Sequence, residues 1–189
     1  MVSPDFLSEC IAVAGAKAKD EAFREAHRPF LRASGEPIPM HSPTHPSPLS
    51  EMEATFYYAG LPSGPPLVAR TSNTPWEMPS GPEAYRKAKE LGGADSHSAL
   101  KKAWRNNLSH EIGALLDSRK VKWTSIDVVR IGYVEEHPKP VILWIGVLPG
   151  SLSGYGGLDV ALKCRDILRE NDITDLEVEI RESVITDLI

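Results

Sequence analysis

Apolar and polar positions in the second half of the chain repeat with the periods of regular secondary structure. Val141–Leu148 is apolar at almost every position, whereas Leu176–Arg181 ("LEVEIR") alternates strictly. These patterns predict a strand buried on both faces and a strand with one solvent-exposed face. Ile126–Val134 is rich in β-branched residues and is separated from Val141–Leu148 by "EEHPKP", so the two segments are predicted to form a hairpin.

Apolar residues three or four positions apart predict helices between these strands. One helix is expected over about Ser96–Ser118 and another over Leu158–Glu170. A third is expected over Ser80–Leu91, because "SGPE" has the spacing of a capping box and two glycines follow Leu91. An N-terminal helix is predicted to begin at Ser3 and to end before Pro29.

The order of these elements predicts an α/β fold, with an α+β fold as the alternative. We expect a small mixed sheet of three or more strands, formed by the hairpin and a right-handed β-α-β unit. Val141–Leu148 lies at its centre, with Ile126–Val134 antiparallel on one side and Leu176–Arg181 parallel on the other. Helices cover one face. The other face needs the N-terminal helix, a ribbon over Phe56–Trp76 or a second protomer.

Composition divides the chain into three parts. Residues 1–33 form the predicted N-terminal helical segment, 34–79 a proline-rich linker and ribbon, and 80–189 the α/β domain. Residues 29–82 hold 12 of the 16 prolines, and no hydrophobic period survives in 34–50. Residues 56–76 contain too many apolar side chains for a free linker, so we expect a ribbon laid across the domain.

The glycine-rich loop Pro149–Gly157 is the main candidate for a ligand site, because it follows the central strand at the carboxyl edge of the sheet. Its candidate ligand-binding residues are Gly150, Ser151, Ser153, Gly154, Gly156 and Gly157. The loop lacks the lysine of a P-loop, and "GSLSG" places leucine where a nucleophile elbow needs serine. Asp159, expected in the first helical turn, would oppose a bound anion. A loop that only turns the chain and caps the helix is the alternative.

A few other side chains are candidates for interaction. Arg70 and Trp76 in the ribbon are suited to partner binding, although Trp76 would equally well anchor the ribbon to the core. Glu177 and Glu179 are expected on the solvent-exposed face of the last strand. Cys164 lies on the apolar side of its helix and is expected to be buried. The histidines form no cluster with ligand spacing, so we expect no metal and no cofactor.

Charge and composition limit the partners. A net charge of −5 argues against a binder of nucleic-acid backbones, and no apolar run approaches the length that spans a membrane. Two cysteines are too few for a disulfide framework, and the N-terminus lacks the basic start of a signal peptide. We therefore expect a cytoplasmic protein without nucleic-acid or membrane partners.

Two stretches resemble a large family of uncharacterised fungal proteins. They are "GLPSGPPLVARTSNTPWEMPSGPEAYRKAKELG" and "VKWTSIDVVRIGYVEEHPKPVILWIGVLPGSLSGYGGLDVALKCRDILRENDITDLEVEIRES", within residues 56–183. Longer members of that family continue into a segment similar to a trypsin-like serine protease, whose catalytic residues have no counterparts here. The resemblance implies a short family member or an N-terminal module, with an accessory or recognition role.

No intact catalytic motif is present, so we expect a non-catalytic module that binds a partner protein or a small ligand. A small enzyme acting on an anionic metabolite through the loop at 149–157 is the first alternative. A homodimer formed through an uncovered sheet face is the second.

Overall fold

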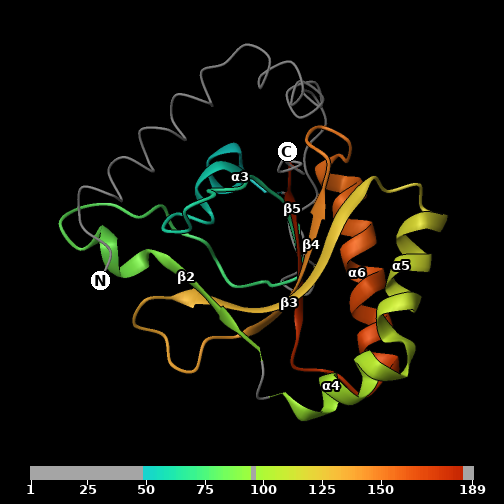
Figure 1. Ribbon diagram of the computed structural model, residues 1–189. Helices are drawn as coiled ribbons and strands as arrows, with labels where there is room; N and C mark the ends of the chain where they lie inside the picture. Colours follow the sequence, from blue (N-terminus) through green and yellow to red (C-terminus); the bar gives the residue numbers. More distant parts are fainter. Residues whose placement is uncertain (1–48, 95–96, 185–189) are drawn as a thin grey trace, which may run out of the picture.

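The computed structural model describes residues 49–94 and 97–184, which form an α/β fold (Figure 1). The expected N-terminal helix and the linker up to residue 48 lie outside these residues. The helical elements are α3 (Glu51–Phe56), the short 3₁₀ turn η2 (Ala84–Lys87), α4 (Ser98–Ala103), the π-helical turn η3 (Trp104–Leu108), α5 (Ser109–Ser118) and α6 (Gly154–Glu170). The strands are β1 (Leu67–Arg70), β2 (Lys89–Gly93), β3 (Trp123–Tyr133), β4 (Val141–Val147) and β5 (Glu177–Glu182).

The five strands form one mixed sheet in the order β1-β5-β4-β3-β2. β4 and β5 run parallel and are joined through α6, while every other neighbouring pair is antiparallel. Ile145 of β4 lies between Ile126 of β3 and Ile180 of β5. The predicted hairpin, the central place of β4 and the parallel pairing with β5 are therefore confirmed.

β4 separates two hydrophobic clusters, because successive side chains of a strand point to opposite faces. Val141, Leu143, Ile145 and Val147 pack with α5 and α6 in the larger cluster. Ile142 and Trp144 belong to a second cluster on the opposite face. This explains why every residue of β4 is buried, as its continuous apolar run predicts.

The ribbon covers the second face of the sheet, which was one of the three covers expected for that face. Tyr57, Tyr58, Leu61 and Leu67 pack there against Trp144. Figure 1 shows α3, which leads into this segment, on the side of the sheet opposite α5 and α6. Both faces of β4 are thus covered within one chain.

The helix predicted over Ser80–Leu91 is wrong. Only the turn η2 is helical, and the chain then enters the edge strand β2, which pairs with β3 from Lys89↔Tyr133 to Gly93↔Val129. Glu83 stands at the start of η2 without a side-chain capping bond. Pairing with the long strand β3 outweighs the local helical signal, and β-propensity depends strongly on such context.

The helix predicted over Ser96–Ser118 is interrupted. α4 and α5 are joined by the π-helical turn η3, in which Asn107 adopts a φ of 110°. A positive φ is uncommon for a residue other than glycine, although asparagine tolerates it better than most. The helix before β5 also begins earlier than predicted, at Gly154 rather than Leu158.

Candidate functional site

The loop after β4 uses its polar groups locally. The Gly150 N–H donates to a carboxylate oxygen of Glu182 at 2.9 Å, and the Ser151 hydroxyl donates to the Leu148 carbonyl at 2.6 Å. Ser153 is the N-cap of α6, and its Oγ accepts from the Gly156 N–H at 3.2 Å. These bonds are those of a loop that turns the chain and caps a helix.

Three of the predicted loop glycines belong to α6 itself. Gly154 and Gly156 lie in its first turn, and Gly157 packs so closely on β1 that a Cβ there would come within 3.0 Å of the Val68 side chain. Asp159 consequently lies beyond the first turn, which corrects the prediction. Its carboxylate pairs with Lys163 and with Arg119, rather than facing an anion site.

Arg70 and Trp76 lie within the packed ribbon. The Arg70 side chain is largely buried, and its Nε donates to a carboxylate oxygen of Glu53 at 2.7 Å. Its terminal nitrogens donate to the carbonyls of Ser72 and Thr74. Trp76 packs against the second hydrophobic cluster. Both residues therefore hold the ribbon to the domain.

Glu179 is buried, with 2% of its surface exposed, which contradicts its predicted place on a solvent-exposed face. Its two carboxylate oxygens accept from the hydroxyls of Tyr57 at 2.6 Å and Tyr58 at 2.7 Å. The Tyr58 hydroxyl also accepts from the Trp144 indole N–H at 2.9 Å. Both tyrosines belong to the ribbon. The ribbon therefore provides the hydrogen-bond donors of the buried Glu179 carboxylate.

The side chain of Lys89 completes this buried polar cluster from the edge strand β2. Its Nζ lies 3.1 Å from the centroid of the Tyr57 ring. Burial lowers the pKa of Lys89 to about 8, and the charge of Glu179 partly offsets this. Burial, reinforced by Glu179, also raises the pKa values of Tyr57 and Tyr58 above the ordinary range. The cluster bonds mainly within itself, and we assign it to holding the ribbon on the sheet.

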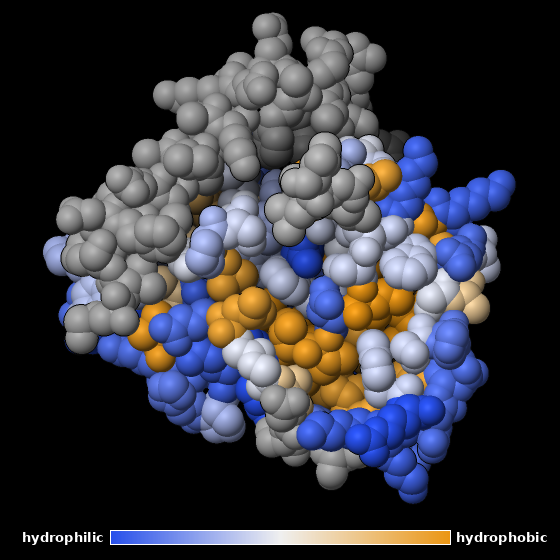
Figure 2. All heavy atoms as spheres, in the orientation of Figure 1, coloured by the Kyte–Doolittle hydropathy of each residue, from blue (hydrophilic) through white to orange (hydrophobic). Residues whose placement is uncertain are grey.

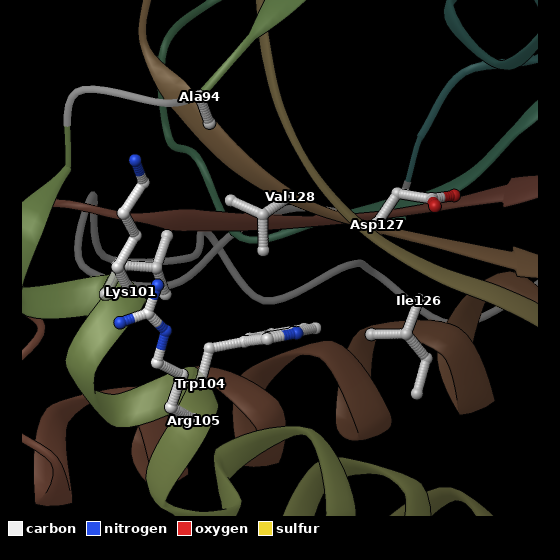
Figure 3. A pocket seen from close by; sticks show the side chains of 8 residues that line it. Ala94, Lys101, Trp104, Arg105, Ile126, Asp127 and Val128 are labelled. Carbon is white, nitrogen blue, oxygen red and sulfur yellow. The ribbon is translucent and has the colours of Figure 1, made fainter.

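A groove lies on the other face, between α4 with η3 and the first half of β3. It encloses about 370 Å³, a volume typical of ligand sites. Its lining residues are Ala94, Leu100, Lys101, Trp104, Arg105, Ile126, Asp127 and Val128. In Figure 3 the Trp104 ring lies along the groove, and the Ile126 and Val128 side chains point toward the helices. The Asp127 carboxylate points away.

Two cations stand at one end of this groove. Lys101 and Arg105 are four residues apart, so their side chains lie on one side of the helical segment. Both are exposed, and neither side chain has a hydrogen bond or an ion pair with another residue of the described part of the chain. Figure 3 shows the Lys101 and Arg105 side chains together at the same end of the Trp104 ring. The groove thus combines apolar walls with a positive end.

The π-helical turn contributes to this arrangement, since Trp104 and Arg105 are its first residues. π-helical turns and backbone outliers such as Asn107 are frequent at functional sites.

Figure 2 shows apolar atoms gathered across the middle of the face presented in Figure 1, with hydrophilic atoms along its lower border.

Sequence reasoning missed the groove because the apolar spacing that includes Leu100 and Trp104 was used only to predict a helix over Ser96–Ser118. Leu100 is buried, but Trp104, Ile126 and Val128 remain partly exposed. The available signal was the pair of lysine and arginine residues flanking Trp104, which has no acidic counterpart in the same turn. Cys164 is buried, as predicted.

Neither a group of side chains suited to a metal ion nor a helix able to span a membrane occurs within residues 49–94 and 97–184. Comparisons with protein-family models, with curated proteins and with solved structures found no match to the chain.

Proposed function

We propose that the protein is a non-catalytic binding module that recognises an anionic ligand with an apolar portion in the groove between α4 and β3. The observation that carries this proposal is the pairing of apolar walls with Lys101 and Arg105, two cations without partners among the described residues. A desolvated anion gains more from a cation than a hydrated one does. An apolar portion lying along Trp104 would exclude water from the charged end.

Binding is favoured over catalysis by the chemistry of the lining residues. Among the described residues, no serine, cysteine or histidine lines the groove, so these residues assemble no nucleophile with an adjacent base there. The carboxylate of Asp127 lies 3.7 Å from Arg181 and points away from the groove. The groove offers hydrophobic contact and positive charge, which are the elements of recognition.

The two alternative functions receive less support. An enzyme acting through the loop at 149–157 would need free hydroxyls or amides, and Gly150, Ser151 and Ser153 use theirs within the loop and its neighbours. A homodimer was expected to cover an open sheet face, and the ribbon now covers that face. The cytoplasm is our proposed compartment, which agrees with the free, buried thiol of Cys164.

The proposal can be tested with 8-anilinonaphthalene-1-sulfonate, a probe that joins an aromatic body to one anionic group. We expect saturable fluorescence enhancement by the folded protein, with an affinity that falls at least fivefold in Lys101→Glu and in Arg105→Glu. Lys102→Glu is the matched control, because Lys102 is an exposed neighbour on the same helix but does not line the groove. Its affinity should stay within about twofold of the wild type.

Absence of saturable binding by the wild type would refute the proposed site. An equal loss in Lys102→Glu would show that the probe responds to the general charge of α4 rather than to the groove. Thermal unfolding of each variant confirms that the comparison is made between folded proteins.

A further inference from the structure

The first half of β3 has an open edge beside the groove. β3 spans Trp123–Tyr133, but β2 pairs only with its second half, and that pairing ends at Gly93↔Val129. On its other side β3 pairs with β4 almost throughout, from Trp123 to Arg130. Among the described residues, no strand lies beside β3 before Val129 on the side of β2. Within the part of the chain that the structure describes, this edge of β3 is therefore unpaired.

The hydrogen bonds of β3 show which backbone groups face that edge. The Ile131 N–H donates to the Pro140 carbonyl on the side of β4, and the Val134 N–H donates to the Ala88 carbonyl on the side of β2. Successive residues of an antiparallel strand present their N–H and C=O groups to alternate sides. The register shows no shift between Ile126 and Tyr133. Ile126 is an even number of residues from Val134, so its backbone groups point to the same side, where β2 has ended.

The groove reaches this edge. Ile126, Asp127 and Val128 all line it, although the side chain of Asp127 points away. Asp127 therefore borders the groove through its main chain, between Ile126 and Val128. Ala94, the first residue after β2, also lines the groove, so an occupant would continue in line with β2.

We infer that the ligand is an extended, acidic peptide segment of a partner protein, which adds to the sheet as a strand along the first half of β3. This inference rests on the proposed function, because it names the occupant of the same groove. Alternate side chains of such a strand point toward Trp104 and fill the apolar part of the groove. Carboxylates on this same face of the strand, two residues beyond the apolar side chains, lie near Lys101 and Arg105. The main chain of the strand pairs with Ile126.

Strand addition accounts for features that a small ligand leaves unexplained. Main-chain hydrogen bonds supply affinity in this mode of recognition, and pockets for alternate side chains supply specificity. Open strand edges are normally covered or protected in proteins. The positive charge of Lys101 and Arg105 selects an acidic segment over a basic one.

The test uses an acetylated, fluorophore-labelled heptapeptide, Glu-Thr-Val-Thr-Val-Thr-Glu, measured by fluorescence anisotropy. Its valines and glutamates share one face of the extended strand. Two variants carry N-methyl groups, one on every residue at an odd position and one on every residue at an even position. A strand added at one edge donates from only one of these two sets, because its other side faces solvent. We expect one methylated peptide to bind at least tenfold more weakly and the other to bind within about threefold of the parent.

Amide hydrogen exchange supplies an independent readout at the strand edge. Saturation with the parent peptide should slow exchange of the Ile126 amide at least tenfold, while an amide of the covered strand β4, such as Leu143, stays unchanged. Loss of peptide binding in Lys101→Glu with retention in Lys102→Glu would place the peptide at the groove.

The outcomes separate this inference from the proposed function. Equal binding by the two methylated peptides, or an unaffected Ile126 amide, would overturn strand addition. If the anionic dye binds at the groove but the parent peptide does not, strand addition fails while the binding site stands. If neither probe binds, both proposals fail.

Discussion

Removing one hydroxyl group from the buried cluster by Tyr58→Phe should destabilise the protein strongly. This hydroxyl donates to Glu179 at 2.7 Å and accepts from the Trp144 indole N–H at 2.9 Å. Loss of a hydrogen bond to a charged group costs about 1.5–3 kcal/mol, and leaving the indole N–H without a partner costs about 1–3 kcal/mol. The expected loss in the free energy of unfolding is therefore about 2.5–6 kcal/mol.

Tyr57→Phe is the matched comparison. It removes a hydroxyl that donates only to the other oxygen of Glu179, so the expected loss is about 1.5–3 kcal/mol. Equilibrium unfolding in urea measures both variants, and an unchanged dependence on urea concentration would show that the same surface is exposed on unfolding. The reasoning is refuted if Tyr58→Phe costs less than about 1 kcal/mol, or if the two variants cost the same.

The remaining predictions concern the buried Lys89 and two glycines. Burial depresses the pKa of Lys89 to about 8, so between pH 8 and pH 9 the unfolded chain binds more protons than the folded one. The free energy of unfolding should therefore rise by about 1 kcal/mol over that interval, and urea titrations at a series of pH values measure this rise. Persistence of the rise in Lys89→Met would contradict its assignment to Lys89. Gly60→Ala should lower the free energy of unfolding by about 1–3 kcal/mol, because Gly60 has a φ of 103° and a Cβ there would lie 2.8 Å from the Lys89 backbone. Gly113→Ala in α5 should raise it by about 0.5–1 kcal/mol, because nothing lies within 4 Å of the added Cβ. Thermal unfolding compares the two variants, and shifts of the same sign would contradict this reasoning.

Local patterns were sufficient for the centre of the fold. The continuous apolar run of β4 predicts burial on both faces, and the helical period predicts α6 between β4 and its parallel neighbour. The edge strands β1 and β2 were missed for a physical reason. Each is five residues or shorter, and its partner is remote in sequence: Leu67 of β1 pairs with Arg181. Such short segments become strands only when the longer strands supply a ladder.

The burial of Glu179 shows the same limit at a single residue. Strict alternation in "LEVEIR" correctly predicts a strand with two unlike faces, but it cannot show what lies on the polar face. The two tyrosines that bond to Glu179 are more than 120 positions away. A buried carboxylate is tolerated when hydrogen bonds replace its water, and only the ribbon provides them.

The chain by itself determined which segments form the central strands, which helix connects them and where the glycine-rich loop follows β4, because these depend on neighbouring residues and their periodicity. The candidate groove depended on tertiary structure. Ala94, Trp104 and Ile126 line one groove because β2 ends before the first half of β3 and η3 interrupts the helix beside it. No local sequence pattern predicts this groove, because it depends on the lengths and packing of three separate elements.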